Sequence, residues 1–287
     1  MSTIVITGVT KDYGATRALD NINLTLEPNK IYGLLGRNGA GKTTLLNLIT
    51  NRIFPTQGEI TLDGQKVLEN DQALGQIFYM MEMNLYPQGF RVKEVFRWSR
   101  EFYPEMDMQY ATALAGKFGL DLNKKVKGLS TGYTSIFKVI IALASNAKVL
   151  IFDEPVLGLD ANHRQLFYRE LIANYSANPK TIIISTHLIE EVADVLEEAI
   201  IIKAGKVILK QPVEELLAQA YTVSGEATKV DRYAEGRSCS GGETLGKFKT
   251  VTVLADLNSR DEALARELGL DFTKIELQKL FISLTNS

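Results

Sequence analysis

The chain has 287 residues, with 32 Lys and Arg against 34 Asp and Glu, so its formal net charge is −2. This balance argues against a protein that coats nucleic acid, because such binding needs concentrated positive charge. The single cysteine, Cys239, excludes an intrachain disulfide, and only two histidines, His163 and His187, argue against a Cys- or His-based metal cage. The length predicts one large domain, alone or with a smaller one.

The N-terminus and the apolar runs predict a chain that stays on one side of the membrane. Residues 1–7 lack the basic region and the cleavage site of a signal peptide. The longest apolar runs, such as 149–152, are far shorter than the roughly 18 residues that a spanning helix needs. We therefore expect a cytoplasmic protein that does not cross a membrane by itself.

The first half of the chain predicts strands and then helices. In chain order we expect two strands within residues 1–30, a strand at 31–35, a glycine loop, a helix at 44–50, a hairpin at 58–67 and mainly helices at 91–145. Asp63 and Gly64 suit the tight turn of the hairpin. The strand, loop and helix within 31–50 are typical of the opening unit of a parallel α/β sheet.

The second half predicts alternating strands and helices before its composition changes. In chain order we expect a strand at 149–152, a helix at 162–175, a strand at 181–184, a helix at 188–196, a hairpin at 199–209, a helix at 212–220, a strand at 248–254 and two short helices. Residues 224–246 are rich in Gly, Ser, Glu and Thr, and their stretch 238–242 predicts an exposed linker. We place a domain boundary near 220, so that 1–220 and 221–287 are separate domains.

One segment matches the pattern G-x-x-x-x-G-K-[ST], which binds nucleotide phosphates. Its residues are Gly36, Arg37, Asn38, Gly39, Ala40, Gly41, Lys42 and Thr43. The glycines let backbone N–H groups turn toward phosphate oxygens, and the helix that continues through Thr44 adds its positive N-terminal end. Lys42 would contact the β- and γ-phosphates, and Thr43 would offer a hydroxyl to Mg²⁺. The pattern predicts a nucleotide site without defining an activity.

Two carboxylates follow the apolar strand at 149–152. At the carboxyl end of this strand Asp153 can hold Mg²⁺, directly or through water. Glu154 would then face the γ-phosphate and orient or deprotonate the attacking water. Together with the glycine loop, this pair predicts a nucleoside triphosphatase.

With these motifs the sequence resembles the ATP-binding cassette (ABC) family of ATPases. Tyr13 resembles the aromatic residue that stacks on adenine. Residues 129–133, Leu-Ser-Thr-Gly-Tyr, fall where the family carries its signature LSGGQ. Residues 158–160 resemble the loop that couples two nucleotide sites, and His187 resembles the switch histidine that contacts the γ-phosphate. The resemblance runs from Tyr13 to about residue 220.

The resemblance implies an α/β P-loop NTPase fold, the ABC cassette. It implies a mixed or parallel sheet core, an N-terminal antiparallel β-subdomain, a helical subdomain at about 84–145 and a small α+β C-terminal extension. The implied cofactors are ATP and Mg²⁺. Ser130 and Gly132 would cap the γ-phosphate held by a second ATP-binding subunit in a head-to-tail dimer.

The resemblance also implies a transmembrane permease as partner and no nucleic acid. The protein would lie at the inner face of the cell membrane through that partner. In the family, a loop such as the one holding Tyr86, Pro87 and Phe90 receives a short helix of the membrane subunit, whereas the helical spacing of 92–96 predicts core residues. The segment 275–285 is similar to the closing helix of ATPase subunits of exporters, which favours export over import. The alternative is an amphipathic helix that packs on its own domain.

Two positions depart from the family pattern. Thr131 replaces a glycine of the signature, and a β-branched residue disfavours both positive φ and close backbone approach. The second ATP-binding subunit is therefore either another copy of this chain, in a homodimer, or a related subunit with the better signature, in a heterodimer. Glu82 stands where the family has a glutamine that touches Mg²⁺ and the attacking water. We expect Glu82 to hold the metal and to slow or re-tune hydrolysis through its added charge, the alternative being a solvated loop glutamate.

The leading hypothesis is therefore the ATP-binding subunit of an ABC exporter. One alternative is a soluble ABC ATPase in translation or DNA repair, but members of those groups carry a second cassette or a long inserted coiled coil. Another is a GTPase or a small-molecule kinase. A GTPase should show the base-recognition motif N-K-x-D, and residues 123–126, Asn-Lys-Lys-Val, lack its aspartate.

Overall fold

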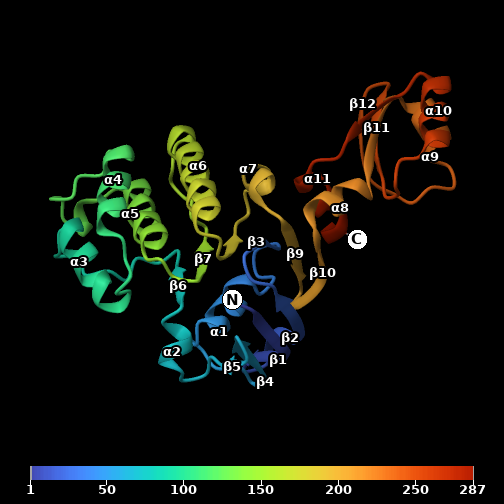
Figure 1. Cartoon of the computed structure of the whole chain (residues 1–287). Coiled ribbons are helices and arrows are strands. Elements are labelled where there is room, and N and C mark those ends of the chain that lie inside the picture. The colour runs from blue at the N-terminus through green and yellow to red at the C-terminus, as the bar shows by residue number, and fades with distance from the viewer. Residues whose placement is uncertain (1, 287) are drawn as a thin grey trace. The chain divides into compact units, whose positions relative to one another are not determined.

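The computed structural model describes residues 2–286, which form two compact units (Figure 1). The first unit contains the residues up to His187 and Ile200–Leu209, and the second contains Leu188–Ala199 and the residues from Lys210 onward. Within residues 2–286, no helix combines the length and the apolar character that crossing a membrane requires.

The first unit begins with a four-stranded antiparallel sheet in the order β2-β1-β4-β5. Its strands are β1 (Ile4–Tyr13), β2 (Thr16–Leu26), β4 (Gln57–Leu62) and β5 (Gln65–Lys66). Apolar residues alternate in β1 and β2 because successive side chains of a strand point to opposite faces of the sheet. β4 and β5 meet at the predicted turn, where Asp63 and Gly64 have φ values of 50° and 77°.

A second sheet has six strands in the order β10-β9-β3-β8-β7-β6. These are β3 (Ile31–Leu35), β6 (Ile77–Met80), β7 (Val149–Asp153), β8 (Thr181–Ser185), β9 (Glu198–Lys203) and β10 (Lys206–Pro212). The strands β3, β8, β7 and β6 run parallel. Every residue of β3, β7 and β8 is buried, which explains their uninterrupted apolar runs. The segments that follow these strands meet at the carboxyl edge of the sheet, where α/β proteins bind ligands.

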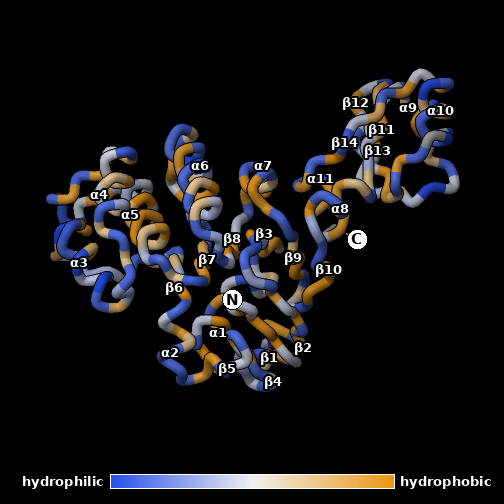
Figure 2. The backbone as a smooth tube through the Cα atoms, viewed as in Figure 1, coloured by the Kyte–Doolittle hydropathy of each residue, from blue (hydrophilic) through white to orange (hydrophobic). Residues whose placement is uncertain are grey.

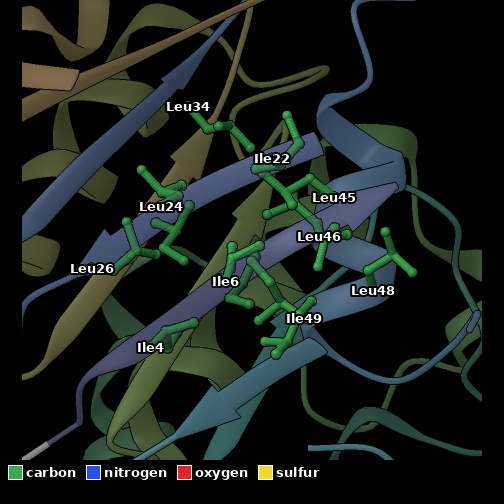
Figure 3. Packing of buried hydrophobic residues seen from close by; sticks show 14 of the residues in the cluster. Ile4, Ile6, Ile22, Leu24, Leu26, Leu34, Leu45, Leu46, Leu48 and Ile49 are labelled. Atoms are coloured by element: carbon green, nitrogen blue, oxygen red, sulfur yellow. The ribbon is translucent and has the colours of Figure 1, made fainter. Parts of the chain in front are cut away.

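The helix α1 (Lys42–Ile49) packs into the core of the first unit. Leu45, Leu46, Leu48 and Ile49 are all buried, and Figure 3 shows them against side chains of β1 and β2. Burying each such side chain contributes about 1.5–3 kcal/mol. This packing fixes the start of α1, and with it the end of the glycine loop.

The first unit contains further helices after α1. They are α2 (Asp71–Leu74), α3 (Val92–Phe102), α4 (Met108–Lys117), a 3₁₀ turn (Val126–Gly128), α5 (Thr131–Ala144) and α6 (Ala161–Ala177). α3, α4 and α5 pack on one another (Figure 1). Asp107 and Asp160 start α4 and α6 by accepting hydrogen bonds from backbone amides. Val92, Val95 and Phe96 are buried, so the prediction that they belong to the core is confirmed.

The second unit contains a four-stranded antiparallel sheet in the order β12-β13-β11-β14. Its elements are α7 (Ile189–Val192), a 3₁₀ turn (Ala193–Val195), α8 (Val213–Ala218), β11 (Tyr221–Glu226), α9 (Ala227–Ala234), β12 (Cys239–Leu245), β13 (Phe248–Val253), α10 (Ser259–Leu268), β14 (Asp271–Lys274) and α11 (Leu277–Asn286). Val223, Val251 and Val253 form its core with Tyr233 of α9. Figure 2 shows the contrast between this unit's hydrophilic α10 and a hydrophobic strand such as β7 of the first unit.

Two features of the second unit differ from the sequence-based predictions. The stretch 238–242 is exposed, as expected, but it is not a linker, because most of it lies in the edge strand β12, paired with β13. The units also do not divide at residue 220. The closing helix α11 packs on α7 and α8, so residues 188–199 and 210–220 belong to the second unit.

Candidate nucleotide site

A pocket of about 290 Å³ lies at the carboxyl edge of the parallel strands. Most of the predicted phosphate and metal residues line it: Arg37, Asn38, Gly39, Ala40, Gly41, Lys42, Thr43, Thr44, Glu82, Asp153 and Glu154, with Ala18. The sheet brings these segments together because the glycine loop follows β3, Glu82 follows β6, and the two carboxylates lie at the end of β7.

The glycine loop needs glycine for two different reasons. Gly39 and Gly41 have φ values of 78° and 111°, in the left-handed region that other residues rarely adopt. A Cβ at Gly41 would also lie 2.9 Å from the carbonyl oxygen of Ala18. At Gly36 the obstacle is packing alone, since a Cβ would meet the carbonyl oxygen of Ile202 at 2.7 Å. The loop backbone therefore packs tightly against its neighbours at Gly36 and Gly41, where a larger residue would clash.

Lys42 is buried beside this loop. Its ammonium donates to the carbonyl oxygens of Gly36, at 2.6 Å, and Arg37, at 3.4 Å. Burial lowers the pKa of Lys42, while Glu154 and Asp153 oppose this change. An anion in the pocket would stabilise the charged amine, which is the role expected of a phosphate-binding lysine.

Oxygen donors gather around Asp153. Its Oδ2 accepts hydrogen bonds from the Thr43 hydroxyl, at 3.1 Å, and from the Tyr79 hydroxyl, at 3.3 Å. Burial, followed by the Asp153 carboxylate, raises the pKa of Tyr79, so this hydroxyl remains protonated as a donor. The Thr43 hydroxyl and the Asp153 carboxylate are the hard oxygen ligands that suit Mg²⁺, and Glu82 lines the same pocket. Tyr79 carries no sequence signal of this role, because only the pairing of β6 with β7 brings it to Asp153.

Hydrogen bonds hold both the backbone and the carboxylate of Glu154. Its backbone N–H donates to the Ser185 carbonyl at 2.8 Å. The Thr186 hydroxyl donates to Oε2 at 3.0 Å, and the His187 N–H donates to Oε1 at 3.1 Å. The His187 ring nitrogen Nδ1 also lies 3.0 Å from Oε2. The carboxylate is thus oriented before any ligand arrives.

The backbone of Glu154 is strained. Its φ of 52° lies in the left-handed region, which costs a non-glycine residue about 1–3 kcal/mol. The contacts with Ser185, Thr186 and His187 hold the residue in this conformation. Such strain is typical of functional sites, so it supports a catalytic role for this carboxylate.

The signature segment lies at the exposed start of α5. Ser130 caps the helix, since its Oγ accepts from the Tyr133 N–H at 3.3 Å. Thr131 occupies the first helical position, so the fold of this chain does not require a positive φ there. Packing excludes any larger residue at Gly132, because a Cβ there would lie 2.5 Å from the Gly158 carbonyl oxygen.

Five predicted site residues do not line the pocket in the described structure: Tyr13, Gly36, Ser130, Gly132 and His187. Gly36 begins the glycine loop, and His187 contacts Glu154. The Tyr13 ring is half-exposed, with the Lys11 ammonium 5.1 Å from its centroid. Ser130 is exposed as well. Their roles toward adenine and toward a second nucleotide site stay predictions.

Comparisons with known proteins point to one family. A family model described as ABC transporter matches residues 19–157. The ABC transporter ATP-binding protein NatA of Bacillus subtilis is 33% identical over 209 residues, which cover 70% of this chain and 84% of NatA. The ABC transporter ATP-binding protein YtrB of the same organism is 30% identical over 64% of this chain and 63% of YtrB.

A ribose import protein is also similar. The ribose import ATP-binding protein RbsA of Caldanaerobacter subterraneus is 27% identical over 86% of this chain, but the match spans 52% of RbsA. The chain therefore covers less than two thirds of the length of YtrB and of RbsA.

Solved structures show the same fold. An ATP-binding subunit of an ABC transporter superposes with a TM-score of 0.68 at 21% identity, covering 74% of this chain and 91% of that chain. A bacterial Atm1-family ABC exporter with ATP bound gives a TM-score of 0.65 at 18% identity, covering 75% and 40%. The predicted ABC cassette fold and, at the level of the family, the predicted class of ABC-type ATPases are confirmed. On this similarity and on the site described above, the chain belongs to the family of ABC transporter ATP-binding proteins.

Proposed function

We propose that this chain binds and hydrolyses ATP and thereby powers transport through a separate transmembrane permease. The observation that carries the proposal is the arrangement around Glu154. Its fixed carboxylate lines the same pocket as Lys42, Thr43 and Asp153. One pocket therefore combines phosphate-binding groups, metal ligands and a general base.

Each residue has a distinct task in this mechanism. The amides of the glycine loop and Lys42 bind the phosphates. Thr43, Asp153 and Glu82 would hold Mg²⁺, which would neutralise negative charge on the phosphates. Glu154 accepts a proton from the water whose oxygen attacks the γ-phosphorus. The bond from the γ-phosphorus to the ADP oxygen breaks, which leaves ADP and inorganic phosphate. His187 orients Glu154 through its N–H and its ring, and it would contact the γ-phosphate as the family resemblance implies.

The exposed start of α5 supports a second subunit as partner. Ser130 presents its hydroxyl, and the positive end of α5, at the surface. In the proposed head-to-tail dimer this edge caps the γ-phosphate held by the other subunit, which is either a copy of this chain or a related one. Hydrolysis would remove the bridging phosphate and open the dimer.

An apolar segment supports docking to a membrane protein. Met83, Leu85 and Phe90 expose 67%, 56% and 43% of their surface. A shallow pocket of about 110 Å³ beside them has a mixed lining of apolar and polar side chains: Arg52, Tyr79, Met80, Met81, Met83, Leu85, Tyr86 and Lys138. A short apolar helix of a permease would cover this segment and hold the protein at the inner face of the membrane.

We infer export as the direction of transport from the closing helix α11. The cassette itself does not encode direction, since relatives named for import and an exporter share it. Reconstitution in vesicles with the permease that copurifies with this chain would measure the direction. Substrate that accumulates on the ATP-containing side would contradict export.

The proposed reaction is tested with Glu154→Gln, which keeps the shape of the side chain and removes the base. The variant should bind Mg-ATP as tightly as the parent, lose turnover by about a hundredfold or more, and accumulate as an ATP-bound dimer in size-exclusion chromatography. Lys42→Ala, which should not bind ATP, is the negative control. If Glu154→Gln hydrolyses ATP at the parent rate, Glu154 is not the base.

A further inference from the structure

A buried lysine of α5 has no task in the mechanism above. Lys138 is only 4% exposed. Its ammonium donates to the carbonyl oxygens of Met81, at 2.6 Å, and Glu82, at 2.8 Å. An ammonium in the interior is costly unless its donors are bonded. These two bonds therefore account for its presence and, in turn, fix the backbone that follows β6.

Two carboxylates of the nucleotide pocket, Glu82 and Asp153, favour the charged form of Lys138. Burial lowers the pKa of Lys138 to about 8, whereas the carboxylates of Glu82 and Asp153 oppose this change. The pocket contains three carboxylates, Glu82, Asp153 and Glu154, to which ATP would add further negative charge. Lys138 and Lys42 are both buried amines in the field of these carboxylates.

The helix that carries Lys138 touches two other parts of the site. Its start is the Ser130 cap, and one turn later the Ser135 hydroxyl donates to the Leu157 carbonyl at 2.8 Å. Leu157 follows Glu154 in the same turn, since its N–H donates to the Glu154 carbonyl. α5 thus connects the exposed signature, the segment after the general base and, through Lys138, the segment that bears Glu82.

We propose that Lys138 is a positioning residue for ATP hydrolysis, which holds the Met81–Glu82 backbone against α5 and offsets the carboxylate that Glu82 brings to the pocket. The inference rests on the proposed function. It explains how an acidic side chain is accommodated where the family resemblance implies a neutral glutamine. Lys138 and Glu82 should therefore be coupled, so that removing the cation does less harm when the carboxylate is also removed.

The test is a double-mutant cycle of Lys138→Met and Glu82→Gln, with ATPase kinetics for each variant. Methionine preserves the apolar stem of lysine and removes the donors. Lys138→Met should lower kcat about tenfold, equivalent to about 1.4 kcal/mol, and change KM for ATP by less than about threefold. In the Glu82→Gln background the same substitution should lower kcat by less than about threefold.

Lys180→Met is the matched control. Lys180 is equally buried, at 4% exposure. It precedes β8 and therefore lies at the opposite end of this strand from Thr186. Its ammonium has no hydrogen-bond partner among the described residues. This variant should keep the parental kcat and KM. Lys138→Gln, which retains amide donors, should fall between the parent and Lys138→Met. Melting temperatures verify that each variant is folded.

Hydrogen exchange of residues 81–86 gives a readout that does not need catalysis. This segment should exchange faster in Lys138→Met than in the parent or in Lys180→Met. If the parent protein proves unable to hydrolyse ATP, the proposed function fails while this comparison still decides the positioning role. Unchanged exchange, a kcat within about twofold of the parent, or additive effects of the two substitutions would overturn the inference.

Discussion

The contact between Gly132 and Gly158 allows a sharp prediction about the signature segment. In Gly132→Ala the new methyl group would lie 2.5 Å from the Gly158 carbonyl oxygen, well inside ordinary contact distance. The start of α5 and the turn at 158 must then move apart by several tenths of an ångström. Forced overpacking of this kind costs about 1–3 kcal/mol. We expect the free energy of unfolding to fall by that amount.

Gly116→Ala provides the matched control. Gly116 lies within α4, is exposed, and a Cβ there would meet no heavy atom within 4 Å among the described residues. Alanine in a helix interior is favoured over glycine by about 0.5–1 kcal/mol, so this variant should be more stable than the parent. The same chemical change is thus expected to have opposite signs at the two positions.

Urea unfolding followed by the fluorescence of Trp98 measures both variants. Trp98 is the single tryptophan of the chain and lies in α3, so its signal reports on the first unit. ATPase turnover of Gly132→Ala should fall as well, because the displaced turn follows Glu154. If Gly132→Ala is as stable as the parent, the tight packing of the signature on Gly158 is refuted.

Three further predictions concern single residues. Ser130→Ala removes the cap of α5 and should lower the free energy of unfolding by about 1 kcal/mol. Ser130→Asp should be as stable as the parent but lose turnover. If the parent and both variants are equally stable, Ser130 does not cap the helix. His187→Ala removes the ring beside Glu154 and should lower kcat more than it changes KM, which steady-state kinetics would check. Lys180→Met removes a buried amine whose pKa burial lowers, and should stabilise the protein by about 1–3 kcal/mol at pH 7. The unfolded chain binds the Lys180 proton more tightly than the folded chain, so the parent should gain stability relative to Lys180→Met as the pH rises toward 10.5. Urea titrations at several pH values measure this trend. A difference in unfolding free energy that stays constant with pH would contradict it.

The segments with strict local requirements were predicted well from the sequence. Gly39 and Gly41 adopt the backbone conformation that their residue type suggests, and the apolar run at 149–152 forms β7, which ends at Asp153 directly before Glu154. The same holds for the hairpin turn at Asp63 and Gly64. In each case the residue itself limits the backbone or the burial, so that no distant contact is needed to predict it.

The second unit shows where such local signals are too weak. β12 has the composition of a flexible linker and becomes a strand because β13 pairs with it. α9 was not predicted, and its buried residues Val230 and Tyr233 pack on the sheet that β11 and β13 form. Strand formation depends on partners that are remote in sequence, so composition alone does not identify it.

The sequence by itself determined the glycine loop, the Asp153–Glu154 pair and the resemblance to the ABC family, because spacing and residue chemistry are read directly along the chain. Only the tertiary structure decided which other groups join them. It brings Tyr79 to Asp153, Thr186 to Glu154 and Lys138 to the carbonyl of Glu82. These contacts depend on how β6, β7, β8 and α5 pack, and long-range packing sets positions that no local pattern encodes.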